Sequence, residues 1–184
     1  MGPEPHARTR SSAERPLRDR ILLRFPSLVD LAALALFRLP PGGLLRRRLV
    51  ERAFQVVWAG INRGDFEPAL LAYEPDAEVR IFGASGVGLA GSYSGSDGWI
   101  EFIGDIFENF GAPRFSVRRV RDGGGRIVAE LGLTATGKVS GAEVEESTSS
   151  VYYFSSRGKV ARQEIFWQQD SWAMALEAAD LSEQ

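Results

Sequence analysis

The sequence predicts an α+β fold, in which a curved antiparallel sheet packs against helices. Apolar residues recur at helical spacing in the segments before residue 110 and alternate with polar residues from 114 onward. A helical pattern returns after residue 170. Glycine- and serine-rich turns separate the alternating segments, which is typical of antiparallel hairpins. With 184 residues, the chain has the length of one domain.

The first part of the chain, residues 1–43, is an arginine-rich leader that we separate from a domain spanning 44–184. Residues 1–15 are polar, and we expect them to be disordered. The segment 16–39 predicts one or two short helices that are interrupted at Pro26. A Pro-Pro-Gly-Gly run ends this segment, and we place the domain boundary there.

The domain opens with a predicted helix over 44–62, because its apolar residues recur every three to four positions. The Asn-Arg-Gly-Asp sequence at 62–65 indicates a helix end followed directly by a helix start. A short second helix then ends near Tyr73, and a strand follows over 76–82. The glycine-rich segment 83–98 predicts a loop.

The next segment is the most amphipathic of the chain, and it predicts a helix capped by Ser96 or Asp97. Six apolar residues fall at helical spacing on its inner face: Trp99, Phe102, Ile103, Ile106, Phe107 and Phe110.

Alternation of apolar and polar residues predicts four strands in the last third of the chain. They span 115–121, 126–139, 143–155 and 159–169. A closing helix is predicted from Asp170 or Ser171 to Leu181.

Composition excludes several kinds of chemistry. The chain has no cysteine, so disulfides, thiol nucleophiles and cysteine-bound zinc or iron–sulfur centres are excluded. Its one histidine is His6, in the leader, which argues against Ser-His-Asp catalysis and against histidine-bound metals. We therefore expect no metal and no cofactor, so any catalysis would rest on Asp, Glu, Tyr, Ser, Arg, Lys or water.

Charge is unevenly distributed along the chain, although the net charge is only −2. Residues 1–52 carry eleven arginines against five acidic residues, whereas the remainder carries eleven basic and nineteen acidic residues. A basic leader can contact an acidic partner, a membrane surface or nucleic acid, but we favour its packing onto the acidic body of the same chain. The acidic body argues against a nucleic-acid ligand. No apolar run approaches a membrane span or a secretory signal, so we expect no stable membrane insertion and a cytoplasmic location.

Three stretches of this chain resemble the nuclear transport factor 2-like superfamily, close to its SnoaL-like branch. They are AFQVVWAGINRGDFEPALLAYEPDAEVRIFG, YSGSDGWIEFIGDIF and SSRGKVARQEIFWQQDSWAMALEAADL, and the resemblance covers roughly 46–181. It implies a cone: a bent sheet closed at one end by three helices, with an apolar pocket inside. Members include ketosteroid isomerases, polyketide cyclases, dehydratases and epoxide hydrolases, while others are binding or dimerisation modules. Arginine-rich segments before the cone are familiar among bacterial members.

The resemblance also allows a test for steroid-type isomerisation. Isomerase-like members place a tyrosine, a carboxylate base and a protonated acid in the pocket. Alignment puts Val57, Ile81 and Ser150 at these three positions, so none of the three groups is kept. We therefore expect a different reaction or none.

The same alignment assigns residues to the pocket. The best candidates for catalysis are Glu146 as acid or base, with Tyr152 and Ser150 orienting a carbonyl or hydroxyl. The expected pocket wall comprises Phe54, Val57, Trp58, Phe82, Trp99, Phe102, Leu131, Leu133, Thr148, Ser150, Tyr152 and Trp167. Many of these aromatic residues would equally serve as ordinary core. Alternation turns Glu130, Arg162 and Glu164 outward, into a charge ladder on the outer sheet face.

Two further patterns are better explained without a ligand. The glycine run at 86–91 matches G-x-G-x-x-G, but more loop follows it where a dinucleotide site needs a helix. We interpret it as a flap near the pocket mouth. Asp76 and Glu78 have the chemistry to hold a cation, but two carboxylates on one strand usually form a solvated face.

Taken together, we expect a small-molecule-binding protein with an apolar or aromatic ligand in its cone. Catalysis, if present, would be a metal-free isomerisation, cyclisation or hydration. We expect a homodimer formed through the outer sheet face. The alternative is a non-catalytic interaction scaffold whose basic leader recruits a partner.

Overall fold

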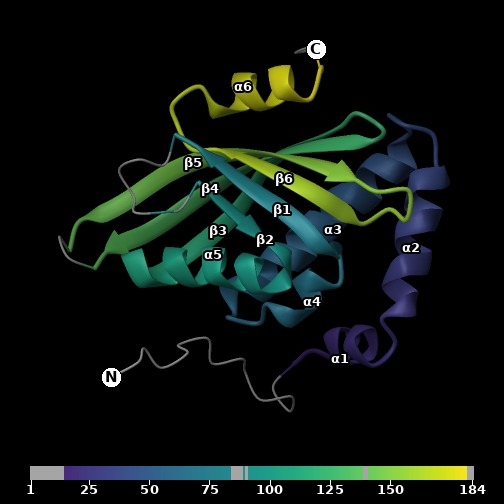
Figure 1. Ribbon diagram of the computed structural model, residues 1–184, viewed down its shortest axis with the longest axis horizontal. Helices are drawn as coiled ribbons and strands as arrows, with labels where there is room; N and C mark the ends of the chain where they lie inside the picture. Colours follow the sequence, from purple (N-terminus) through teal and green to yellow (C-terminus); the bar gives the residue numbers. More distant parts are fainter. Residues whose placement is uncertain (1–14, 84–88, 90, 139–140, 182–184) are drawn as a thin grey trace.

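The computed structural model describes residues 15–83, 89, 91–138 and 141–181. It confirms the predicted α+β class, with one curved, six-stranded sheet and helices on both of its faces (Figure 1). The helices are α1 (Leu17–Arg24), α2 (Ser27–Arg38), α3 (Leu44–Asn62), α4 (Glu67–Leu70), α5 (Gly95–Asn109) and α6 (Ser171–Ala178). The strands are β1 (Tyr73–Phe82), β2 (Ser92–Ser94), β3 (Phe110–Asp122), β4 (Arg126–Gly137), β5 (Glu143–Phe154) and β6 (Val160–Phe166).

The strands follow the order β2-β1-β6-β5-β4-β3 across the sheet. β3, β4, β5 and β6 form successive antiparallel hairpins, with Leu131 opposite Thr148 and Ser150 opposite Ile165. β1 joins β6 in parallel, and β2 pairs antiparallel with β1 at the sheet edge. The hairpins agree with the predicted alternation, because each short turn returns the chain beside the strand it has just left.

Several boundaries differ from the prediction: β1 begins at Tyr73, and α5 begins at Gly95 with Ser94 before it, so neither Ser96 nor Asp97 caps it. β2 lies inside the segment predicted to be a loop, where its three residues pair with β1. Gly95 adopts a positive φ of 70°, which turns the chain from β2 directly into α5. The predicted helical residue Phe110 instead begins β3 with an extended φ of −118°. An apolar residue at the end of a periodic run fits a helix or a strand, and here pairing with Gly137 makes it a strand residue.

Helices α3 and α5 lie on one face of the sheet, and α6 lies on the other (Figure 1). The main core is between the sheet and the first pair of helices, where Ile61, Ile103 and Leu133 are almost fully buried. On the far face, α6 packs Ala175 and Leu176 against Val128 and Val151. The curved sheet with its helices is the cone that the resemblance implies.

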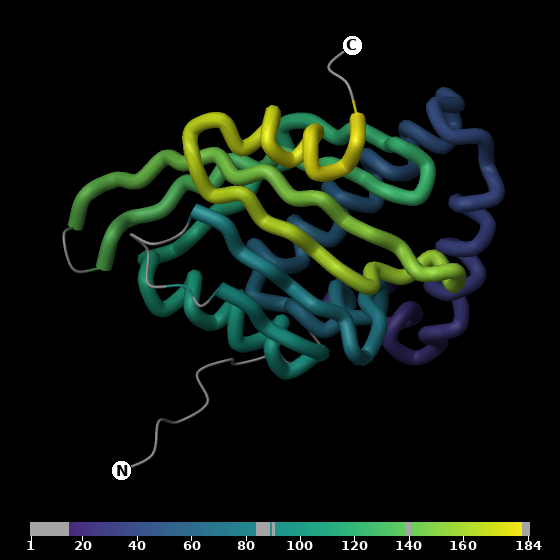
Figure 2. Tube along the Cα trace, turned by 45° about the horizontal axis from the view of Figure 1, so that its top comes forward, coloured from purple at the N-terminus to yellow at the C-terminus, as the bar shows by residue number. Residues whose placement is uncertain are grey.

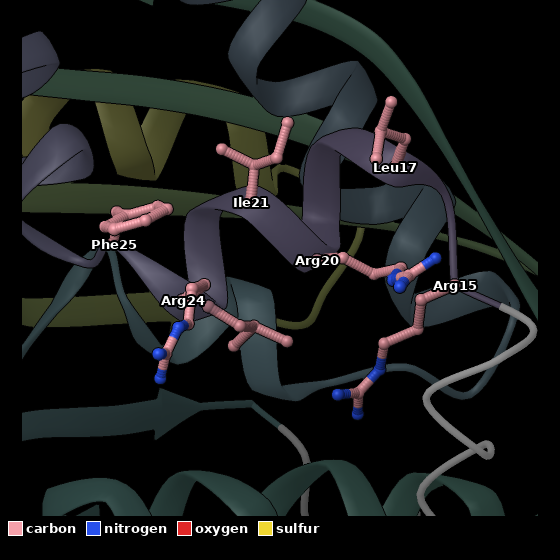
Figure 3. Close-up of a pocket in the computed structure, with 7 residues that line it drawn as sticks. Arg15, Leu17, Arg20, Ile21, Arg24 and Phe25 are labelled. Carbon is pink, nitrogen blue, oxygen red and sulfur yellow. The ribbon is translucent and has the colours of Figure 1, made fainter.

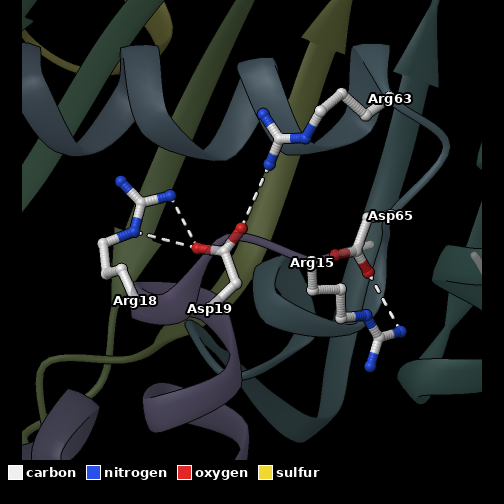
Figure 4. Close-up of polar contacts among 5 residues, drawn as sticks. All are labelled: Arg15, Arg18, Asp19, Arg63 and Asp65. Carbon is white, nitrogen blue, oxygen red and sulfur yellow. Dashed lines mark hydrogen bonds and ion pairs between the residues drawn. The ribbon is translucent and has the colours of Figure 1, made fainter. Parts of the chain in front are cut away.

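The leader helix α1 is tied to the corner between α3 and α4 by ion pairs (Figure 4). The buried carboxylate of Asp19 accepts a hydrogen bond from Arg63 at 3.0 Å and another from Arg18 at 2.6 Å. Arg15 forms a further ion pair with the buried Asp65 at 3.1 Å. An arginine of the leader therefore pairs with a carboxylate of the domain, and a carboxylate of the leader pairs with an arginine of the domain. This agrees with our expectation that the basic leader packs on its own body.

Helix α2 packs at the end of the sheet where a turn joins β5 to β6. Its Phe37 ring lies 4.6 Å from that of Phe154, and its Asp30 pairs with Lys159 at 2.9 Å. The predicted disordered segment falls almost wholly on residues 1–14, outside the described residues. Within the described part of the chain, no helix has the length and apolar character needed to cross a membrane.

Candidate functional site

A cavity of about 600 Å³ lies between α2, α3 and one end of the sheet. Its wall is almost wholly apolar. The wall is formed by helices and by the strands β1, β4, β5 and β6 or their ends. It includes Val29, Ala33, Leu36, Phe37, Val50, Phe54, Val57, Trp58, Tyr73, Trp99, Ile127, Tyr152, Phe154 and Val160. A cavity of this size and polarity is typical of a site for a small apolar molecule.

The two helices form this wall because each presents a stripe of residues at helical spacing. On α3, Val50, Phe54 and Val57 recur at intervals of four and three, so they share one face. On α2, Val29, Ala33 and Leu36 do the same. The stripes do not interdigitate fully, and the space left between them and the sheet is the cavity.

A cluster of neutral polar side chains lies at the sheet side of the cavity. Tyr73 donates a hydrogen bond to the side-chain oxygen of Gln163 at 2.7 Å. The side-chain nitrogen of Gln163 donates to the Tyr152 hydroxyl at 3.2 Å and to Ser150 Oγ at 3.3 Å. Both tyrosines line the cavity, whereas Gln163 and Ser150 are buried behind them.

Burial keeps both tyrosines neutral. It raises the pKa of Tyr73, and a contact with Trp99 opposes that rise only in part. Burial and the nearby Tyr73 raise the pKa of Tyr152 well above its ordinary value, against a smaller opposing effect of Ser150. Neither phenol is therefore a base near neutral pH. Since the Tyr152 oxygen already accepts from Gln163, its own hydrogen is left for Ser150 or for an acceptor on a ligand.

Carboxylates are absent from the described lining of this cavity. Its one charged residue is Lys159, which is paired with Asp30. A charged ligand would lose its hydration in this cavity without gaining a partner of opposite charge, which is strongly unfavourable. The arrangement suits an uncharged molecule that meets hydrogen-bonding groups at one end.

The structure places the twelve predicted wall residues in four settings. The cavity is lined by Phe54, Val57, Trp58, Trp99 and Tyr152. Phe102, Leu131, Leu133 and Trp167 are packed in the main core, and Thr148 and Ser150 are buried on β5. Phe82 lies elsewhere, because its ring stacks on Phe166 at 5.1 Å and is 42 % exposed.

The three predicted catalytic residues all lie on β5, but only two of them lie near one another. Tyr152 and Ser150 both contact Gln163. Glu146 is exposed toward the other end of the strand, opposite Leu133. Six residues of extended strand separate it from Tyr152, which corresponds to about 20 Å. One small ligand would not reach both groups in this cavity.

Sequence reasoning missed Tyr73, Gln163 and the whole of α2 as parts of the site. The sequence did indicate that Gln163 points inward, because it lies two residues from the inward residue Ile165 and so shares its face of β6. For Tyr73, the predicted strand began three residues too late to give it a direction. The role of α2 depends on packing between distant segments, which local patterns do not reveal.

Two sequence patterns were explained without a ligand: the acidic pair Asp76 and Glu78, and the glycine run at 86–91. Glu78 accepts two hydrogen bonds from Arg80, both at 2.8 Å, and Arg80 lies two residues further along the same strand. In the described ranges, no group of acidic or histidine side chains is arranged to hold a metal ion. The glycine run at 86–91 lies mostly outside the described residues, so its predicted role as a flap stays a prediction.

The outward charges form pairs, as alternation predicts. Arg119 donates to Glu130 at 2.6 Å, and Arg162 lies 3.3 Å from Glu164. These pairs share a sheet face with α6 and lie away from the cavity.

Comparison with solved structures shows that the fold is shared. The structure of TerC co-crystallised with polyporic acid has a TM-score of 0.56 and 22 % identity, covering 70 % of this chain and 97 % of TerC. An NTF2-like protein of unknown function from Burkholderia pseudomallei has a TM-score of 0.57 and 21 % identity, with coverages of 69 % and 94 %. A Mycobacterium tuberculosis protein in complex with estradiol-17β-hemisuccinate has a TM-score of 0.52 and 17 % identity, with coverages of 65 % and 93 %. No curated protein matches the chain.

The family comparison is more specific. The family described as SnoaL-like domain matches residues 50–163, which is more than half of the chain and includes most of α3, all of α5 and most of the sheet. The chain therefore belongs to the SnoaL-like domain family.

Proposed function

We propose that this protein binds an uncharged, largely apolar small molecule in the cavity between α2, α3 and the sheet. The observation that carries the proposal is the composition of the cavity wall. The wall encloses about 600 Å³, is almost wholly apolar and has neutral hydrogen-bonding groups on one side. Burying an apolar ligand there is favourable, at roughly 25 cal/mol for each Å² removed from water.

Orientation of the ligand would come from the Tyr73–Gln163–Tyr152 cluster. A carbonyl or hydroxyl at one end of the ligand replaces the contact between Tyr152 and Ser150, while the aromatic rings of Trp58 and Trp99 cover its apolar part. In support of a small-molecule ligand, one solved structure of this fold was co-crystallised with polyporic acid and another is a complex with estradiol-17β-hemisuccinate.

Catalysis would extend this proposal to a metal-free isomerisation, cyclisation or hydration. Tyr152 lines the cavity and would polarise a carbonyl as a neutral donor, whereas Ser150 is buried behind it and Glu146 lies about 20 Å along the strand from Tyr152. We therefore propose binding as the function, with hydrogen-bond assistance from Tyr152 as the part that a reaction would use.

A homodimer stays a prediction. Helix α6 packs against β4, β5 and β6 on the outer sheet face, so such a dimer would have to use the outer face of β1 or β3, or α6 itself. The mass of the native protein in solution would decide between one and two copies.

The experiment that tests the binding proposal is a titration with Nile red, an uncharged apolar dye whose emission rises in apolar surroundings. We expect saturable binding to the full chain. Val57→Phe fills part of the cavity and should weaken binding about tenfold, because the added ring has nowhere else to pack.

Val56→Phe is the matched control, since it adds the same ring to the same helix at a position that does not line the cavity. Its affinity should equal that of the unaltered protein. Equal weakening by both variants, or no saturable binding at all, would show that the cavity is not the site.

A further inference from the structure

Helix α2 is apolar on all sides, yet none of its twelve residues is fully buried. Only Ser27, Asp30 and Arg38 are polar, and the remaining nine residues are aliphatic or aromatic. A helix with this composition normally lies inside a core or in an apolar medium. Here one stripe faces the cavity, and the opposite stripe is left without a partner in the described structure.

The exposed stripe of α2 consists of Leu28 and Leu31, while the exposed Ala32 and Ala35 beside them already belong to the lining of the cavity. It continues an apolar edge, because α1, α2 and the start of α3 follow one another along the same end of the molecule (Figures 1 and 2). The large exposed apolar residues of this edge are Leu17, Ile21, Phe25, Leu28, Leu31, Leu44, Leu45 and Leu49. Among the described residues, the one other large apolar side chain with such exposure is Phe82.

Leucine side chains on this edge are strongly exposed: Leu17 by 69 %, Leu31 by 63 % and Leu44 by 75 %. On α1 they lie above a surface hollow of about 370 Å³ (Figure 3). Leu17, Arg20, Ile21 and Arg24 line this hollow together (Figure 3), and their spacing of three and four residues places them on one face of α1. The exposed face of α1 therefore carries aliphatic and basic side chains next to one another.

The free charges of this edge are all positive. Its carboxylates are already paired: Asp19 with Arg63, Asp30 with Lys159 and Glu51 with Arg47. The exposed arginines that carry no ion pair to any described residue are Arg20, Arg24, Arg38 and Arg48. The edge thus offers aliphatic side chains beside unpaired cations.

A second copy of this chain fits the edge poorly. Contact between two leaders would bring like-charged arginines together, which is unfavourable. Some acidic residues of the domain are paired with its own arginines, as Glu74 is with Arg157 and Glu145 with Arg118. Exposed acidic residues without an ion pair to any described residue, such as Glu101 and Glu108 on α5, have no exposed large apolar side chain beside them on that helix. The described domain surface also has no apolar patch to receive the leucines, since Phe82 stands alone.

We propose that α1, α2 and the start of α3 dock on the surface of a bilayer that contains anionic phospholipid. A bilayer supplies both partners that the edge lacks: acyl chains for the leucines and phosphates for the arginines. The protein lies on the surface and does not cross the membrane. This docking does not depend on what the cavity binds. From the sequence alone, only the apolar segment 28–37 suggests a membrane contact, and we would expect no vesicle binding.

The test is flotation of the full chain with vesicles of phosphatidylcholine that contain about 30 % phosphatidylglycerol, beside vesicles of phosphatidylcholine alone. We expect binding to the anionic vesicles that weakens as salt is raised, because salt screens the arginines. Binding to neither kind of vesicle, or equal binding to both, would overturn the proposal.

Two paired variants locate the surface. Arg20→Gln with Arg24→Gln should weaken binding roughly thirtyfold, since each basic residue near an anionic surface contributes about fivefold. Leu28→Ser with Leu31→Ser should weaken it about tenfold or more, through lost burial of aliphatic groups. All four residues are exposed, so the fold should be kept, and circular dichroism checks this.

The matched controls are Arg118→Gln with Arg121→Gln, which removes the same charge from β3, and Phe82→Ser, which removes the other exposed apolar side chain. Both should bind vesicles like the unaltered chain. Losses as large in the controls would overturn the proposal. It would also be overturned if the chain were a dimer in solution that the leucine variant converts to a monomer, because a second copy would then cover this edge.

Discussion

Arg46 is the largest side chain that the fold buries almost completely, with 2 % exposure. Its guanidinium donates to Asp122 at 2.9 Å and to the carbonyl oxygens of Gly124 and Leu39, and it lies 4.8 Å from the centre of the Phe37 ring. It thereby joins the end of α2, the start of α3 and the β3–β4 turn. A buried charge of this kind becomes costly when its partner is removed.

Arg46→Met should therefore lower the free energy of unfolding by about 3–5 kcal/mol, because Asp122 is left buried and unpaired. Denaturant unfolding measures this. Arg47→Met is the matched control: Arg47 is 67 % exposed, and its pair with Glu51 should contribute less than about 1 kcal/mol. Similar losses in the two variants would contradict the role of burial.

Glu74 gives the fold a dependence on acid pH. Hydrogen bonding from Ser155 holds the pKa of Glu74 below its ordinary value of 4.5; burial opposes this, and Arg157 adds to it. The folded protein therefore binds fewer protons at Glu74 than the unfolded chain does. The resulting stability is present above pH 4.5 and is lost as the pH falls toward the lowered pKa.

Glu74→Gln should remove that contribution, so the free energy of unfolding should fall less steeply below pH 4.5 than in the unaltered protein. Urea unfolding over a series of acid pH values measures the slope. The variant should also be less stable at neutral pH, because Arg157 loses its partner. Parallel curves for the two proteins would show that other carboxylates set the acid dependence.

Among the elements, α2 depends on a close approach by the β5–β6 turn. Gly158 adopts a φ of 76°, and a Cβ at this position would lie 3.1 Å from the Cβ of Ala33 and 3.2 Å from the Phe37 ring. Helix and turn therefore approach as closely as only glycine permits, which holds α2 over the cavity.

Gly158→Ala should cost stability in two ways, through the left-handed backbone and through displacement of α2, for a total of about 2–3 kcal/mol. Gly64→Ala isolates the first effect, because Gly64 has nearly the same φ of 75° and no neighbouring atom within 4 Å. Thermal unfolding of both variants should therefore show a larger loss for Gly158→Ala. Equal losses would mean that α2 moves aside without cost.

The elements also differ in how far local patterns predict them. Helix α5 was predictable because Trp99, Phe102 and Ile106 repeat at helical spacing over its whole length. The β4–β5 hairpin was predictable from alternation between two turns rich in glycine and serine. Strand β2 was not, because its three residues lie within a glycine- and serine-rich stretch and become a strand only by pairing with β1.

For the whole molecule, the cone was predictable and the position of its cavity was not. Phe54 and Trp58 were recognisable as inward residues of α3, but Phe102 and Leu133, predicted to share their pocket, are packed in the core. What distinguishes the two groups is the distance from α2, and that distance depends on contacts such as Phe37 with Phe154 that join segments far apart in the sequence. Local spacing contains no information about such contacts.

One consequence follows from the position of α2, which forms a wall of the cavity with one stripe and leaves the other exposed. A single rigid helix cannot move on one side without moving on the other. If occupants bind on both sides, any displacement of α2 by one changes the affinity for the other, and thermodynamics requires the change to be equal in both directions. A molecule in the cavity would then change how tightly the surface holds its partner, and a contact at the surface would change how tightly the cavity holds its ligand.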